Sequence, residues 1–146
     1  MDEPPLTALL ARAADLCAER GARLTPRRRR VLEIICRSDR PLGAYQVLDQ
    51  LGAKAAPPTV YRALDFLLDQ GLIHKLETLH AFVGCTHPEH PHASQFLICA
   101  DCGDVTELED PGVDGSLRTI ARETGFKPRH PVVEVIGTCA DCALKP

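Results

Sequence analysis

Apolar side chains recur every three to four residues through the first half of the chain, which is the pattern of amphipathic helices around one core. The first predicted helix runs from Leu6 to Gly21, a glycine that suits a C-terminal cap. A second begins with Thr25 as N-cap and Pro26 as its first residue, and a third, shorter helix covers residues 43–51. Cys17 and Cys36 fall beside the apolar positions, so we expect both to pack in the core.

A fourth predicted helix begins near Pro58 and ends at Gly71. At about 100° per residue its apolar face consists of Val60, Ala63, Leu64, Leu67 and Leu68, and Tyr61 and Arg62 point away from it. Two short extended runs, LIHKLE and HAFVG, follow with a turn between them. Helices followed by a two-stranded hairpin are typical of a winged helix-turn-helix, which we place at residues 1–83.

The second half of the chain predicts a different, smaller domain. The segment GCTHPEHPHAS has turn-forming residues and no periodicity, and so predicts a linker. SQFLIC, DVTEL and HPVVEVIGTC predict strands, and residues 112–124 predict a helix. We expect residues 84–146 to form this linker and a small domain with one helix on a short sheet, so that the whole chain is of the α+β class.

Charge is distributed unevenly between these two parts. Residues 1–83 contain 12 Lys and Arg against 10 Asp and Glu, whereas residues 84–146 contain 5 against 10. This asymmetry mildly favours nucleic-acid binding by the first part. The acidic N-terminus and the lack of a long apolar run predict a soluble, cytoplasmic protein without a signal peptide. Seven cysteines in such a chain favour metal ligation or reactive thiols over a disulfide framework.

The sequence CADC occurs twice and supplies four cysteines at the spacing of a zinc site. Two residues between cysteines let one tight turn direct both sulfurs at one point, and two such turns complete a tetrahedral thiolate set. The predicted structural zinc ligands are Cys99, Cys102, Cys139 and Cys142. A thioredoxin-like redox pair is the alternative, although neither copy follows a redox pattern at a helix N-terminus.

Histidines gather between the predicted hairpin and the first CADC. Five of the six lie within 19 residues around Cys85, and Glu107 follows in the next strands; the five are His74, His80, His87, His90 and His92. These side chains predict either a second metal site with mixed nitrogen, sulfur and oxygen ligands or a solvated histidine-rich loop. The spacing does not tell which histidines converge.

An enzymatic alternative starts from His87-Pro88-Glu89 followed by a C-x-x-C pair, which is similar to the zinc deaminase signature. Only nine residues separate Glu89 from Cys99, however, and Ile98 stands where that signature has proline. Residues 1–83 also lack the pattern of a substrate pocket. We therefore expect a protein that is not an enzyme.

Basic and aromatic residues mark a predicted DNA-facing surface. Arginines at a helix start oppose the helix dipole, so the run Arg27 to Arg30 favours phosphate contact over a structural role. Arg62 suits bidentate contact with guanine, and Tyr61 beside it suits a phosphate or a thymine methyl. The predicted DNA-contacting residues are Arg23, Arg27, Arg28, Tyr45, Thr59, Tyr61 and Arg62.

The chain resembles the ferric uptake regulator family, and specifically its zinc uptake regulator branch, from about Leu6 to Cys142. The resemblance rests on RLTPRRRRVL, GAYQVLDQL, PPTVYRALDFLLDQGLIHKLET, FLICADCGDVTEL and the terminal CADC. It implies a homodimeric bacterial repressor of zinc-uptake genes that binds palindromic operator DNA through its winged helix and dimerises through the C-terminal domain. Neither a membrane nor a small-molecule substrate is implied.

The resemblance also implies two Zn²⁺ per chain, one structural and one regulatory. The matching regulatory ligands are His74, Cys85, His92 and Glu107, with His90 and His87 as substitutes for His92. Cys85 favours zinc, because the family's iron and manganese sensors use nitrogen and oxygen donors in this site. The sequence departs from a third site found in many members, since Ala93, Ser94 and Gln95 precede the first CADC and Thr124 stands near the end of the C-domain helix.

Overall fold

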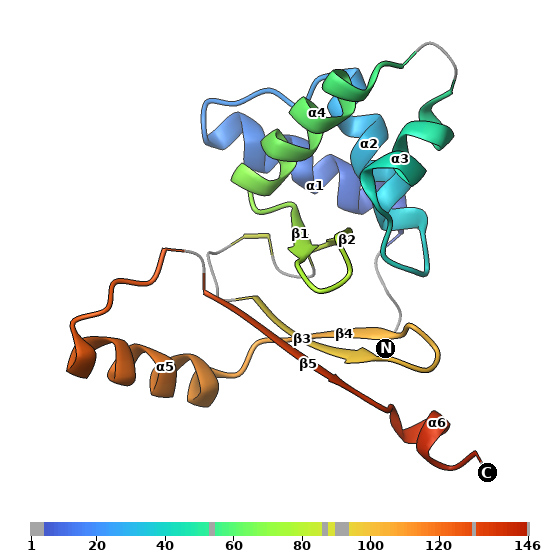
Figure 1. The fold of residues 1–146 in the computed structure, drawn as a ribbon. Helices are drawn as coiled ribbons and strands as arrows, with labels where there is room; N and C mark the ends of the chain where they lie inside the picture. The colour runs from blue at the N-terminus through green and yellow to red at the C-terminus, as the bar shows by residue number, and fades with distance from the viewer. Residues whose placement is uncertain (1–4, 53–54, 86–87, 90–93, 130, 146) are drawn as a thin grey trace. The chain divides into compact units, whose positions relative to one another are not determined.

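The computed structural model describes residues 5–52, 55–85, 88–89, 94–129 and 131–145. The chain divides into two units, Met1–His90 and Pro91–Pro146 (Figure 1). Among the described residues, no helix combines the length and apolar character needed to cross a membrane. The elements are α1 (Leu6–Glu19), α2 (Pro26–Arg37), α3 (Ala44–Leu51), α4 (Pro57–Asp69), β1 (Ile73–Leu76), β2 (Ala81–Gly84), β3 (Ser94–Cys99), β4 (Val105–Leu108), α5 (Pro111–Thr124), β5 (Val132–Gly137) and α6 (Ala140–Ala143).

The N-terminal unit is a helical core with a two-stranded hairpin, as the periodicity predicts. Helix α2 packs against α1, α3 and α4. Thr25 Oγ1 accepts a hydrogen bond from the backbone N–H of Arg28, so the predicted N-cap of α2 is confirmed. The buried residues of α4 are the predicted Val60, Ala63, Leu64 and Leu67. Gly71 has a φ of 69°, the left-handed conformation that ends this helix.

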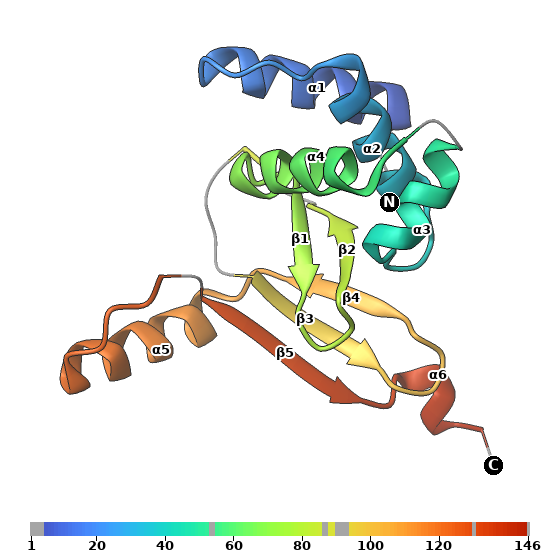
Figure 2. The ribbon, with the colours of Figure 1, turned by 45° about the horizontal axis from the view of Figure 1, so that its top comes forward.

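The hairpin forms the wing of a winged helix-turn-helix, which is confirmed as the fold of this unit. Strands β1 and β2 pair antiparallel, with Ile73 opposite Gly84 and Leu76 opposite Ala81 (Figure 2). Leu42, in the segment before α3, forms a bridge with Phe82 through two backbone hydrogen bonds of 3.1 and 2.8 Å. The wing is therefore hydrogen-bonded to the segment before α3 in addition to packing against the core.

The C-terminal unit has a three-stranded sheet in the order β4-β3-β5. Strand β3 pairs antiparallel with β4 and parallel with β5. The expected helix is present as α5, but it lies beyond the end of the sheet in both ribbon views instead of covering it. The expectation of a helix packed on its own sheet is thus wrong, and most of the apolar side chains of α5 are left exposed.

Candidate metal centre and nucleic-acid interface

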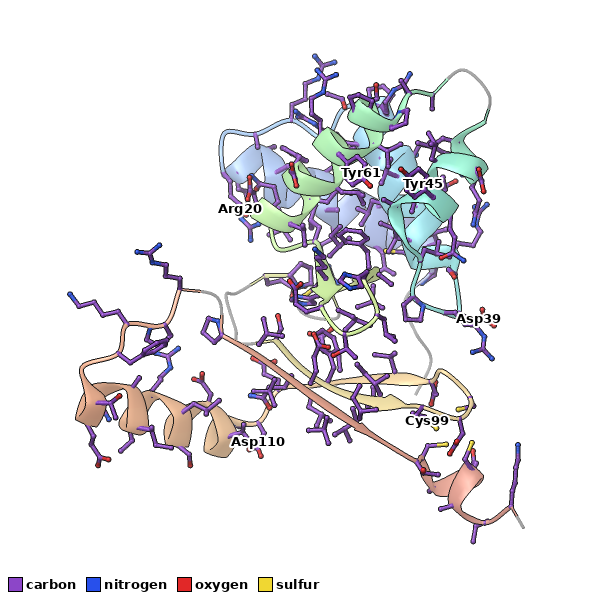
Figure 3. The ribbon with its side chains drawn as sticks, in the orientation of Figure 1. Arg20, Asp39, Tyr45, Tyr61, Cys99 and Asp110 are labelled. Atoms are coloured by element: carbon purple, nitrogen blue, oxygen red, sulfur yellow. The ribbon has the colours of Figure 1, made fainter. Side chains whose placement is uncertain are left out.

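The parallel pairing of β3 and β5 brings the two CADC segments to the same end of the sheet. Cys99 is the last residue of β3 and lies opposite Gly137, the last residue of β5. The chain then turns through Gly103, whose φ of 78° suits a residue without a side chain. The second segment begins with Cys139 as the N-cap residue of α6. Figure 3 shows sulfur atoms gathered around Cys99 beside this helix.

The distances between the four sulfurs match a tetrahedral zinc site. The Sγ atoms of Cys99, Cys102, Cys139 and Cys142 all lie within 4.8 Å of one another. Zn–S bonds of about 2.3 Å in a tetrahedron separate two sulfurs by about 3.8 Å, and Cys102 Sγ lies 3.8 Å from Cys139 Sγ. The residues present therefore fit zinc, and the predicted grouping of the four cysteines agrees with this geometry.

Hydrogen bonds and contacts among the four thiols shift their pKa values. The backbone N–H of Cys139 donates to Cys99 Sγ at 3.3 Å, and with the N–H of Cys102 it lowers the pKa of Cys99 to about 6. Contact with the Cys139 thiol raises the pKa of Cys142. Four thiolates this close together repel one another, so a bound cation is what makes all four favourable at neutral pH.

Four thiolates also fill the coordination shell of zinc. A catalytic zinc keeps an open position for water, which this set does not leave. Glu89, the predicted acid/base of the deaminase alternative, forms an ion pair with Arg12 at 2.9 Å. His87 lies outside the described residues. The geometry favours structural zinc over the enzymatic alternative.

Two of the predicted regulatory ligands lie together on the wing. His74 is on β1 and Cys85 directly follows β2, and a ring nitrogen of His74 lies within 4.8 Å of Cys85 Sγ. The backbone N–H of Cys85 donates to Leu72 O at 2.9 Å, which extends the ladder of the hairpin by one residue. Imidazole and thiolate at this separation can bind one metal ion.

The other two predicted ligands belong to other parts of the chain. Glu107 is a half-buried residue of β4 in the C-terminal unit, paired with Phe96 of β3. His92, like its substitutes His87 and His90, lies outside the described residues. The four-ligand regulatory set stays a prediction.

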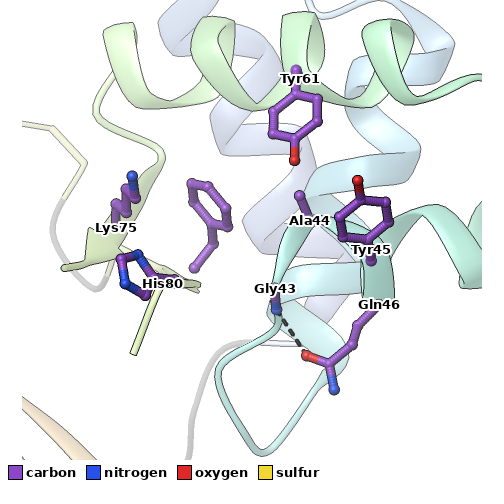
Figure 4. A pocket seen from close by; sticks show the side chains of 8 residues that line it. Gly43, Ala44, Tyr45, Gln46, Tyr61, Lys75 and His80 are labelled. Atoms are coloured by element: carbon purple, nitrogen blue, oxygen red, sulfur yellow. Dashed lines mark hydrogen bonds between the residues drawn. The ribbon is translucent and has the colours of Figure 1, made fainter. Parts of the chain in front are cut away.

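The predicted DNA-facing residues of α3 and α4 lie on the surface of the N-terminal unit. Tyr45 is 68% exposed and Tyr61 46% exposed, and Figure 4 shows their hydroxyl groups directed toward each other. Arg62 is exposed, and its Nε donates to Pro58 O one turn earlier at 3.3 Å. Thr59 is half-buried at the start of the same helix. Large amphipathic side chains in such exposure can contact a duplex groove.

A hollow of about 370 Å³ adjoins these tyrosines, and sequence reasoning missed it. Its lining also includes Lys75, His80 and Phe82 of the wing (Figure 4). His80 has a φ of 50°, which places it in the tight turn between β1 and β2. The histidine therefore lines the hollow instead of joining His74 and Cys85. Only the hairpin register, which the sequence does not specify, reveals this position.

The arginines at the start of α2 differ in their surroundings. The guanidinium of Arg28 lies 3.8 Å from the centre of the Phe66 ring, and its Nη1 donates to Arg23 O at 2.8 Å. Arg28 thus has a structural contact that sequence reasoning did not anticipate, because Phe66 lies on another helix. Arg23 and Arg27 are exposed. Their contact with DNA, like that of Arg28, stays a prediction.

The fold and the four-cysteine site define a winged-helix protein with a thiolate zinc centre. The model of the "Ferric uptake regulator family" matches residues 19–136, and the chain belongs to this family. It is 44% identical to the zinc uptake regulation protein of Escherichia coli (strain K12) over 146 residues, which are 97% of this chain and 85% of that protein.

Solved structures agree in fold over nearly the whole chain. One, described as "Crystal structure of holo XcZur", matches with a TM-score of 0.89 and 45% identity, over 94% of this chain and 99% of that one. Another, "Zinc Uptake Regulator Complexed With Zinc AND DNA", has a TM-score of 0.90 and 43% identity, over 97% of each chain. The resemblance to zinc uptake regulators expected from the sequence is confirmed.

Proposed function

We propose that this protein is a transcription regulator, not an enzyme, that binds operator DNA as a zinc-loaded homodimer and represses zinc-uptake genes. The observation that carries the proposal is the His74–Cys85 pair, a potential zinc-binding pair on the wing of the N-terminal unit. The similarity to zinc uptake regulators, one of them complexed with zinc and DNA, supports it. A regulator of this kind would act in the cytoplasm.

Two zinc ions per chain fit this function. Cys99, Cys102, Cys139 and Cys142 would hold the structural ion, and His74, Cys85, His92 and Glu107 the regulatory one. Thiolate and imidazole ligands favour zinc over harder cations. When bound, the regulatory ion supplies a cross-link between side chains that are distant in sequence. Residues 1–83 would then be the DNA-binding domain and residues 84–146 the hinge with the dimerisation domain.

The regulatory step would be a shift between conformations of one dimer. Ligands from the wing, the hinge and β4 come together only in the zinc-loaded form, which restricts how the two winged helices are placed. Two recognition helices must meet operator half-sites about one DNA turn, or a multiple of it, apart. By linkage, zinc raises the affinity for DNA by the same factor by which DNA raises the affinity for zinc.

Base recognition would come from α4 and α3. Arg62 and Tyr61 on the exposed face of α4, with Tyr45 of α3 and Thr59, would reach base edges in the major groove. Arg23, Arg27 and Arg28 would neutralise phosphates without reading the sequence. The exposure of Arg23, Arg27, Tyr45, Tyr61 and Arg62 on one unit, together with the basic balance of residues 1–83, supports this division of roles.

Dimerisation would cover the apolar surface of the C-terminal unit. Ile120 of α5 is 56% exposed and Phe126 is 68% exposed. The outer strand β5 adds further exposed apolar side chains, namely Val132, Val135 and Ile136. An edge strand with apolar side chains is a template for pairing with another chain. A second copy of this unit would cover the apolar side chains that both elements expose among the described residues.

Selection of DNA fragments at two buffered levels of free zinc tests this function. The protein is incubated with sheared DNA from its own source, and the retained fragments are sequenced. We expect a few palindromic sites near zinc-uptake genes to be retained only at replete zinc. Equal retention at both levels would identify instead a constitutive DNA-binding protein with purely structural zinc.

A further inference from the structure

Gly84, the residue before the predicted ligand Cys85, lies against the thiol of Cys36 from α2. A Cβ atom added at Gly84 would lie 2.9 Å from Cys36 Sγ, closer than side-chain carbons approach other atoms. The backbone of β2 at Gly84 therefore packs directly against this sulfur atom. No other residue type fits at position 84 without a shift of β2 or of Cys36.

The two faces of the wing separate this contact from the metal ligands. Ile73 lies opposite Gly84 and is fully buried in the helical core. Side chains alternate between the faces of a strand, so His74 and Cys85 belong to the other face. The core face of the hairpin thus rests on α2, and the opposite face carries the imidazole and the thiol.

Besides its pairing with β1, strand β2 is held at two further points along its length. Phe82 is fastened to Leu42 by their two backbone hydrogen bonds, and Gly84 rests on Cys36. Beyond Gly84 the backbone hydrogen bond from Cys85 to Leu72 continues the ladder. The contact between Gly84 and Cys36, together with the pairing of β1 and β2, consequently sets where Cys85 lies relative to His74.

We infer that Cys36 is a positioning residue for the regulatory zinc, because its thiol seats the end of β2 and thereby places Cys85 beside His74. The inference rests on the proposed function of Cys85 as a ligand. The groups of potential metal-binding side chains among the described residues do not include Cys36. Burial raises the pKa of its thiol to about 11, which suits a neutral packing group.

The test is a double-mutant cycle on the full chain, with the affinity for each Zn²⁺ measured by competition with a chromophoric chelator. Gly84→Ala is expected to weaken the binding of the regulatory zinc about 10- to 100-fold, the range found when groups supporting metal ligands are altered. The affinity for the four-cysteine zinc is expected to stay unchanged. Cys36→Ala in the same chain removes the sulfur that the new methyl group meets. The double variant is therefore expected to recover to within about threefold of Cys36→Ala alone.

Matched controls separate this contact from general effects of the substitutions. Gly43→Ala adds the same methyl group where the nearest atoms outside its chain neighbours are 3.6 and 3.7 Å away. Cys17→Ala removes a fully buried thiol elsewhere in the core. Both are expected to keep the zinc affinity of the original chain. If Gly84→Ala does not fold, Cys36→Leu presses on the same backbone from α2 and is expected to weaken the binding of the regulatory zinc likewise.

The outcomes distinguish this inference from the proposed function. In the same assay, Cys85→Ser should abolish binding of the regulatory zinc. Unchanged binding of both ions would overturn the regulatory site itself. If Cys85→Ser loses the ion but Gly84→Ala or Cys36→Leu binds it with the original affinity, only the positioning role of Cys36 is overturned. Failure of the double variant to recover has the same consequence. The Co²⁺-loaded spectrum, which reports thiolate ligation, should change with Gly84→Ala, and the spectrum of the double variant should match that of Cys36→Ala alone.

Discussion

At the scale of single residues, the cysteines differ in what surrounds their sulfur atoms. Cys17 is completely buried in the helical core, and Cys36 is half-buried against Gly84. Burial raises the pKa of Cys36 from 9.0 to about 11, so the unfolded thiol ionises before the folded one. Its contribution to stability is full below pH 9 and is lost as the pH rises from 9 to 11.

This pKa predicts slow alkylation of Cys36 in the folded chain. At pH 8 we expect iodoacetamide to modify it at least about tenfold more slowly than in urea, because the folded thiol carries less thiolate and is shielded. Mass spectrometry of peptides at successive times measures the rate for each cysteine. Equal rates in the folded and unfolded chains would show that the thiol is accessible and ionised as in water.

Replacing single cysteines by serine distinguishes the roles of the two predicted zinc sites. Cys85→Ser should abolish zinc-dependent DNA binding and leave a folded dimer, whereas Cys99→Ser should unfold or monomerise the C-terminal unit, because four-thiolate zinc contributes directly to folding. Zinc content per chain, circular dichroism and operator binding measure the three effects. A full zinc response in Cys85→Ser would contradict the regulatory role of this residue.

Arg62 on α4 tests base recognition. Arg62→Ala should reduce the discrimination between operator and random duplex by about 1–3 kcal/mol, since a bidentate contact with guanine is lost. The discrimination is obtained from dissociation constants for both duplexes, measured over a range of salt concentrations. We expect the salt dependence of these constants to stay nearly unchanged. An equal loss of affinity on the two duplexes would reassign Arg62 to phosphate contact.

At the scale of elements, helix α5 has an apolar face that is exposed among the described residues. Val113, Leu117 and Ile120 recur at helical spacing and are exposed. Ile120→Glu should convert the dimer to monomer, because a buried charge at an interface costs several kcal/mol, whereas Thr119→Glu, at an exposed position of α5 that points away from this face, should not. Light scattering after size exclusion measures the mass of each. A dimeric Ile120→Glu variant would place the interface elsewhere.

Most elements could be predicted from the sequence, because their periodicity and caps are local. Thr25, Pro26 and Gly71 mark helix ends by their own backbone preferences. The short helix α6 was missed, since four residues carry no periodic signal. The position of α5 could not be predicted either: an apolar helix face indicates that something covers it, not whether the cover is its own sheet or a second chain.

At the scale of the whole molecule, the two metal sites differ in how far the sequence predicts them. The four cysteines follow from C-x-x-C spacing, and the parallel register of β3 and β5 brings both pairs together. The pairing of His74 with Cys85 depends on the register of the wing, and the spacing of the histidines alone left it open. The support of Cys85 by Cys36 is invisible in the sequence, because 49 positions separate the two residues.

The central claim is that zinc binding and DNA binding are coupled in one dimer, and the linkage between them tests it most directly. The dissociation constant for operator DNA is measured at scarce and at replete free zinc, and the dissociation constant for the regulatory zinc is measured with and without operator. We expect zinc to lower the first constant by the same factor by which operator lowers the second, and this factor to exceed about fivefold. An operator affinity that is the same at both zinc levels, while the four-cysteine zinc stays bound, would contradict the account.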